Sequence, residues 1–164
     1  MIEHIDSQFF DNLHAAFRDG DANIAGKLEE AENVSRVEKI FSTIARHDFE
    51  ALGEVLADDV VLDVIASADN PMAGQTRGLQ QVTEATRKNF ALLEDQKPII
   101  ESVVAQGDSV VVVARERGRI AATGRSYDIR WVQVYKFREG KLISIREWAD
   151  SEAFREAAGP SGLA

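Results

Sequence analysis

Alternating hydrophobic and polar positions fill the last third of the chain and predict three consecutive strands. The predicted strands cover residues 109–117, 127–137 and 141–148. β-Branched and aromatic side chains dominate all three segments, as the half-buried surface of a pleated strand favours. Glu139-Gly140 separates the second segment from the third, where a two-residue hairpin requires positive φ. We therefore expect an antiparallel meander, and we expect any functional site to lie on it.

Helical periodicity dominates the part of the chain that precedes the meander. Helices are predicted at Ser7–Arg18, at residues 48–57 and at residues 79–93. The main helix begins either near Ser35, which opens a capping-box pattern, or already at Asn23. The connecting segments are predicted to be strands at residues 60–65 and 99–105 and a loop at residues 67–78. Helices grouped ahead of antiparallel strands indicate the α+β class.

Composition and charge restrict the kinds of partner that we expect. The chain of 164 residues has 28 acidic and 19 basic side chains, and its formal net charge of −9 argues against nucleic acid and anionic membranes. It contains no cysteine, which excludes disulfides and fits a reducing, cytoplasmic location. Its three histidines lie far apart without metal-binding spacing. We therefore expect no metal, no other cofactor, no nucleic acid and no membrane as partners.

Two segments resemble a known superfamily. Asp48–Val60 is similar to the passage from helix to first strand in nuclear transport factor two-like proteins, and Gly140–Asp150 resembles their closing strand. Within the superfamily, residues 34–154 resemble the SnoaL-like and ketosteroid-isomerase-related branch. The resemblance implies a cone in which a curved, antiparallel-rich mixed sheet wraps around three helices and leaves one central cavity. It also implies an N-terminal helical extension at residues 1–33, a cone domain at 34–154, a tail at 155–164 and frequent dimers.

Strand alternation, combined with this resemblance, assigns side chains of the meander to the cavity. The inward side chains are Val110, Val112, Ala114, Glu116, Tyr127, Ile129, Trp131, Gln133, Ile143, Ile145, Glu147 and Ala149. An inward glutamate on each of two strands suits acid/base chemistry, because burial raises a carboxyl pKa and a second carboxylate raises one of the pair further. We expect the substrate to contact Trp131, Gln133, Ile129, Leu62, Val64 and Ile145.

Three residues are the predicted catalytic group. Glu147 is expected to transfer the proton, with Trp131 shielding it from water. Glu116 is expected to be its acid or orienting partner, and Tyr127 to donate a hydrogen bond to a substrate oxygen. A structural interpretation stays open, in which an arginine forms a salt bridge to Glu147 and Glu116 lies at a wet cavity mouth.

Several positions differ from the catalytic residues of better-known family members, which argues against this chain having the same reaction as those proteins. Val64 stands where ketosteroid isomerases have an aspartate base, and Ile40 stands where they have a helical tyrosine. In the pattern of limonene epoxide hydrolases the acid positions fall on Glu116 and Glu147, but the arginine falls on Ala114. The resemblance therefore implies a fold and a cavity, and it leaves the reaction open.

Two functions remain as hypotheses. The first is a cofactor-independent isomerase, cyclase, dehydratase or hydrolase that acts on a small hydrophobic polycyclic or terpenoid-like substrate. The second is a binding module that holds an apolar ligand without chemistry. We also expect a homodimer through the outer sheet face, where Arg130, Arg146 and Trp148 point away from the cavity. The alternating Arg115, Arg117 and Arg119 indicate a solvated outer face paired with acids such as Asp128, or else an anion or dimer contact.

Overall fold

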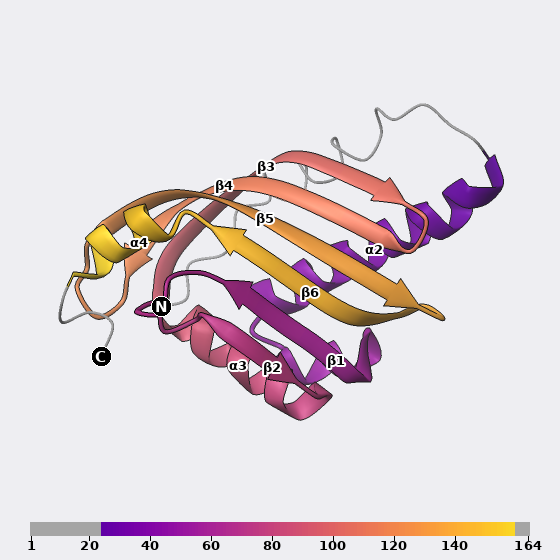
Figure 1. Ribbon diagram of the computed structural model, residues 1–164, viewed down its shortest axis with the longest axis horizontal. Coiled ribbons are helices and arrows are strands. Elements are labelled where there is room, and N and C mark those ends of the chain that lie inside the picture. Colours follow the sequence, from indigo (N-terminus) through magenta and orange to yellow (C-terminus); the bar gives the residue numbers. More distant parts are fainter. Residues whose placement is uncertain (1–23, 160–164) are drawn as a thin grey trace.

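Six strands form one curved sheet in the computed structural model, which describes residues 24–159 (Figure 1). They are β1 (Leu56–Ile65), β2 (Gly74–Arg77), β3 (Leu93–Gln106), β4 (Ser109–Ile120), β5 (Ser126–Arg138) and β6 (Lys141–Ala149). Their order across the sheet is β2-β1-β6-β5-β4-β3. All neighbours are antiparallel except β1 and β6, which run parallel. The mixed sheet and the α+β class predicted from the sequence are confirmed.

Within the described residues, four helical segments accompany the sheet. They are α2 (Ile24–Ala45), the 3-10 helix η1 (Phe49–Glu54), α3 (Leu79–Ala91) and α4 (Ser151–Ala158). The longer of the two alternatives for the main helix is correct, because α2 runs without interruption from Ile24. The predicted helix at Ser7–Arg18 lies outside the described residues. None of the helices within residues 24–159 has the length and apolarity that crossing a membrane requires.

The second predicted helix, at residues 48–57, is wrong in type and in length. The structure has a 3-10 helix there, which ends at Glu54, and residues 56 and 57 already belong to β1. Phe49, Leu52 and Val55 are all buried. This spacing of three residues matches the three residues per turn of a 3-10 helix, so each turn brings one apolar side chain to the core.

The predicted loop at residues 67–78 contains the short strand β2, which pairs with β1 at the edge of the sheet. Its sequence, Gly-Gln-Thr-Arg, has no hydrophobic alternation, so nothing in the sequence pattern predicts a strand there. The strand β3 likewise starts at Leu93, six residues before its predicted beginning at Ile99. The added residues are mostly polar, and Asp95 interrupts their extended backbone with a φ of 50°.

Irregular pairing bends the sheet into the curved form seen in Figure 1. The register shifts between β3 and β4 at two places, and again between β5 and β6 and between β1 and β6. Such bulges bend strands and increase their twist. The helix α4 packs against β5 at one end of the sheet. Its first turn is capped by the Asp150 carboxylate, which accepts a hydrogen bond of 3.2 Å from the Ala153 N–H.

The outer face of the sheet carries the paired charges that the alternating arginines predict. Asp128 accepts two hydrogen bonds of 2.6 Å from Arg115 and one of 2.9 Å from Arg117. These guanidinium groups, Arg115 first, lower the pKa of Asp128 to about 2. On the neighbouring strands Arg146 lies 3.3 Å from Asp63, and Arg130 lies 3.3 Å from Glu101. The ionic network therefore lies on the face opposite the core.

Candidate functional site

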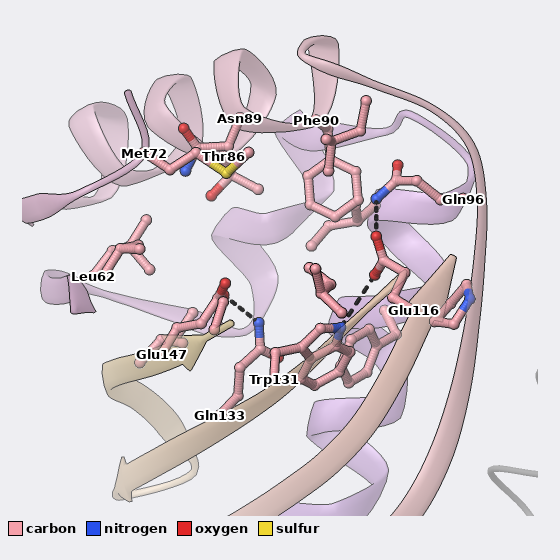
Figure 2. Close-up of a pocket in the computed structure, with 18 of the residues that line it drawn as sticks. Leu62, Met72, Thr86, Asn89, Phe90, Gln96, Glu116, Trp131, Gln133 and Glu147 are labelled. Carbon is pink, nitrogen blue, oxygen red and sulfur yellow. Dashed lines mark hydrogen bonds between the residues drawn. The ribbon is translucent and has the colours of Figure 1, made fainter. Parts of the chain in front are cut away.

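A cavity of about 140 Å³ lies between the inner face of the sheet and the helices α2 and α3 (Figure 2). Most of its walls are apolar, and aromatic rings come from α2, α3, β5 and α4. All six predicted substrate-contacting residues line it: Leu62, Val64, Ile129, Trp131, Gln133 and Ile145. Both predicted acids, Glu116 and Glu147, also border it. Strand alternation therefore assigns these eight side chains to the face that borders the cavity.

Five other side chains predicted to point inward do not line the cavity: Val110, Val112, Ala114, Tyr127 and Ile143. At the bulge between β5 and β6, Leu142 and not Ile143 is fully buried.

Glu116 is held by three neutral hydrogen-bond donors. Its Oε1 accepts from the Tyr127 hydroxyl at 2.6 Å and from Gln96 Nε2 at 3.2 Å, and its Oε2 accepts from the Trp131 indole N–H at 3.2 Å. The residue is only 8% exposed. Because all three partners donate, the geometry suits an ionised carboxylate, which only accepts. Glu116 is therefore best described as a buried, oriented anion in the cavity wall.

Tyr127 has a different role from the predicted one. Its hydroxyl is committed to Glu116, and the side chain is not among those that line the cavity. Burial, and secondarily the charge of Glu116, raise the pKa of Tyr127, so the phenol stays protonated and continues to donate. A Cβ at Gly118 would lie 2.5 Å from the Tyr127 oxygen, so the glycine on the adjacent strand is required for this placement. We therefore replace the expected contact with substrate by a role in positioning Glu116.

Glu147 lies in the cavity wall apart from Glu116, as Figure 2 shows. Its Oε2 accepts a hydrogen bond of 2.6 Å from Gln133 Nε2, and the Gln133 Oε1 in turn accepts from the Tyr135 hydroxyl. The tyrosine can only satisfy the amide oxygen by donating, so it fixes which end of the Gln133 amide faces the carboxyl group. Within residues 24–159 the second oxygen, Glu147 Oε1, has no hydrogen-bond donor from the protein.

The environment of Glu147 favours its protonated form. Burial raises the pKa of Glu147 above its ordinary value, the hydrogen bond from Gln133 opposes this shift, and the negative charge of Glu116 adds to it. By surface area the residue is only half-buried, because one side of it borders the cavity while protein surrounds the rest. The two carboxyl groups thus differ in their partners: Glu116 accepts from three donors, whereas Glu147 accepts from one and is suited to hold and release a proton.

The structural interpretation of the two acids is wrong. Glu147 is hydrogen-bonded to an amide and not to an arginine, and Glu116 is buried and not at a wet mouth. Trp131 also differs from expectation, because its indole N–H binds Glu116 and not the surroundings of Glu147. In the part of the chain that the structure describes, the residues lining the cavity include no lysine, arginine or histidine.

Several polar residues at the cavity were not predicted as site residues. They are Asn70, Thr86, Asn89 and Gln96. Thr86 follows Val82 and precedes Phe90 at helical spacing, so helical periodicity is a signal that could have identified it. Gln96 lies in a polar stretch with no strand alternation, and no sequence signal places it beside Glu116. No three His, Cys, Asp or Glu side chains within residues 24–159 are grouped so that they could hold a metal ion.

Replacing Tyr127 by phenylalanine is expected to destabilise the fold by about 1.5–3 kcal/mol, because a hydrogen bond to a buried charged group is lost. Tyr135→Phe is the matched control, since it removes a hydroxyl from an equally buried ring whose acceptor is a neutral amide. The expected cost of the control is about 0.5–1.5 kcal/mol. Urea unfolding of both variants measures the difference. Equal losses would contradict the description of Glu116 as an ionised acceptor.

Comparison with known proteins agrees with this geometry. The family model of the SnoaL-like domain matches residues 37–145. No curated protein matches the chain significantly. Among solved structures, an NTF2-like protein from Burkholderia xenovorans is 29% identical, with a TM-score of 0.69, over 79% of this chain and 98% of its own.

Two further structures share the fold at lower identity. A SnoaL-like polyketide cyclase from Jannaschia is 20% identical, with a TM-score of 0.73, over 86% of this chain and 100% of its own. TerC, crystallised with polyporic acid, is 19% identical, with a TM-score of 0.68, over 77% of this chain and 97% of its own. The match of the family model covers more than half of the chain, and the structural neighbours have the same cone-shaped architecture.

Proposed function

The chain belongs to the family of SnoaL-like domains, and from this premise we propose that it is a cofactor-independent enzyme that transfers protons on a small hydrophobic ligand. The observation that carries the proposal is Glu147: a carboxyl group with a raised pKa borders the cavity through an oxygen that no described protein donor occupies. A general acid or base needs both a suitable pKa and an open path to the reacting atom.

The proposed reaction step is a proton exchange between Glu147 Oε1 and the ligand. In the protonated state Glu147 gives a proton to a ligand oxygen, and as a carboxylate it takes one from a neighbouring carbon or hydroxyl. Gln133 and Tyr135 hold the other end of the carboxyl group, so that rotation does not carry Oε1 away from the cavity. Isomerisation, cyclisation, dehydration and hydrolysis all use such a step, and the neighbouring polyketide cyclase and the complex with polyporic acid support a small organic ligand.

A binding module without chemistry is the second candidate function. Val64 and Ile40, the positions of the base and the tyrosine of ketosteroid isomerases, contribute only apolar surface to the cavity. Mass spectrometry of the purified protein identifies the bound compound, and incubation with that compound then separates the two functions. Chemical conversion is expected of the enzyme. Recovery of the compound unchanged after many equivalents have been supplied would support the binding module.

We also propose that two copies pair through the outer face of the sheet. Val113, Val132, Trp148 and Ile65 stand next to one another in register across four strands. Trp148 and Ile65 are each 40% exposed, and Val104 on the edge strand β3 is 57% exposed. An apolar row of this kind, bordered by the ion pairs of Arg146 and Arg130, fits a self-complementary interface better than open water.

Light scattering is expected to give a mass of twice the 18.1 kDa chain at micromolar concentration. Val132→Asp introduces an unpaired charge in the middle of the apolar row and is expected to shift the mass to that of a single chain. Arg155→Asp changes the charge on α4 and serves as the control, with no expected change in mass. A single-chain mass for the unmodified protein would contradict the proposal.

A further inference from the structure

The described residues that line the cavity include carboxyl groups and no positively charged side chain. Glu116 is buried and receives its three hydrogen bonds from neutral groups, a phenol, an indole and an amide. The described lining contains a second carboxyl group, Glu147, and no cationic side chain. A buried carboxylate without a counter-charge is costly, and a positively charged ligand would relieve that cost.

Aromatic rings form a large part of the remaining wall. Phe41 of α2, Phe90 of α3 and Trp131 of β5 all border the cavity, and the rings of Phe41 and Trp131 stack with their centres 6.1 Å apart. The faces of aromatic rings carry partial negative charge and attract cations, and most strongly so where water is excluded. The aromatic wall and the carboxylates therefore both favour a positively charged ligand.

The size of the cavity restricts the ligand further. Its volume of about 140 Å³ is close to the ~150 Å³ of an apolar protein cavity that holds one benzene molecule. A single ring with small substituents fits this space without rearrangement, and a polycyclic skeleton exceeds it. The oxygens of Glu116 already accept three hydrogen bonds, so a primary ammonium would find few free acceptors for its three N–H groups.

We propose that the cavity selects a small organic ammonium ion, tertiary or quaternary, whose apolar body is no larger than one ring. Methyl or methylene groups around the nitrogen contact the apolar wall, and the spread charge faces the aromatic rings and Glu116. This assignment rests on the proposed function, because it takes the same cavity as the ligand site. The carboxylate of Glu116 and the faces of the aromatic rings should disfavour anions of the same size.

Binding of a cation is coupled to the proton of Glu147. A positive charge in the cavity favours the ionised carboxylate, so the cation should bind more tightly as the pH rises from 5 to 8. The groups that face Glu147 from the packed elements and can also titrate are Glu116 from β4 and Tyr135 from β5. Among the described residues, the lining side chains of β1, β3, α2, α3 and α4 carry no titratable group. A neutral ligand of the same shape should show no such increase.

The experiment compares phenyltrimethylammonium with tert-butylbenzene, which has the same shape and no charge, and with benzoate, which has the opposite charge. Binding is followed by the fluorescence of Trp131 in the cavity wall, and Trp148 on the outer face gives a constant background. We expect the cation to bind at least about ten-fold more tightly than tert-butylbenzene, and benzoate not to bind measurably. Glu116→Gln should reduce the preference to about three-fold or less, and Glu101→Gln, on the outer face, should leave it unchanged.

The outcomes separate this inference from the proposed function. If the cation and tert-butylbenzene bind within about three-fold of each other, the charge preference is wrong, and the cavity remains a ligand site for neutral molecules. If none of the three probes binds, both proposals fail together. Should Glu116→Gln not fold, the pH series on the unmodified protein decides: a cation affinity that does not rise between pH 5 and 8 overturns the inference.

Discussion

Replacing Glu147 by glutamine is expected to lower turnover by about 10²–10⁴-fold while the protein stays folded, measured with the compound that mass spectrometry identifies as the substrate. The amide keeps the size of the carboxyl group and still offers an oxygen to Gln133 Nε2, but it cannot exchange a proton with the ligand. Asp63→Asn is the matched control, because Asp63 lies next to Val64, the β1 partner of Glu147, and faces Arg146 on the outside. Turnover within a few-fold of the unmodified protein would show that Glu147 does not perform the proton transfer.

The same variant has an expected effect on the pH dependence of stability. The pKa of Glu147 is raised in the folded protein, so the folded state binds more protons than the unfolded state between the ordinary carboxyl pKa and the raised one. Its contribution to stability is therefore fully present below the ordinary pKa and is lost as the pH rises through the raised pKa. Glu147→Gln should flatten this decline, and urea unfolding from pH 4 to pH 8 measures it. A steeper decline in the variant would contradict the protonated state assigned to Glu147.

Trp131→Ala is expected to have the largest effect on stability, a loss of about 3–5 kcal/mol. The side chain is 6% exposed, stacks on Phe41 and donates its N–H to Glu116, so truncation removes packing and leaves a buried anion with one donor fewer. Trp148→Ala on the neighbouring strand is the control, since its ring is 40% exposed on the outer face, and we expect a loss below about 1 kcal/mol.

Urea unfolding of both tryptophan variants should be compared at a protein concentration where light scattering gives them the same mass. This condition matters because Trp148 belongs to the proposed interface, and dissociation would change the measured stability. Losses of similar size in the two variants would show that Trp131 is not a central support of the cavity wall.

Strong local patterns made most of the fold predictable. The meander has a high content of β-branched and aromatic residues and a hairpin glycine at Gly140, and the structure has strands there from β4 to β6. Where the pattern is weak the prediction fails: β2 has four polar or small residues, and it is a strand only because β1 offers it an open edge. Pairing of this kind depends on distant segments, so local propensity carries no information about it.

The sequence allows one to predict which face of the sheet each site residue lies on, but not which residues its side chain contacts. Period-two alternation places Glu116 and Glu147 on the inner face, since a strand side chain has only two directions. The partner of each side chain depends on register between strands and on bulges, which the sequence does not display. Tyr127 illustrates this: whether its hydroxyl meets a ligand or Glu116 depends on Gly118 lying opposite it in the β4–β5 pair.

The parallel contact between β1 and β6 also has a consequence during synthesis of the chain. Val64 of β1 pairs with Glu147 of β6, and all the residues of the helix α3 and of four strands are made between them. Until β6 leaves the ribosome, β1 can pair only with its edge neighbour β2, and its other edge stays open to foreign strands. The nascent chain is thus most prone to aggregation just before the carboxyl group of the site is added, and a chaperone that covers β1 would be most useful during that interval.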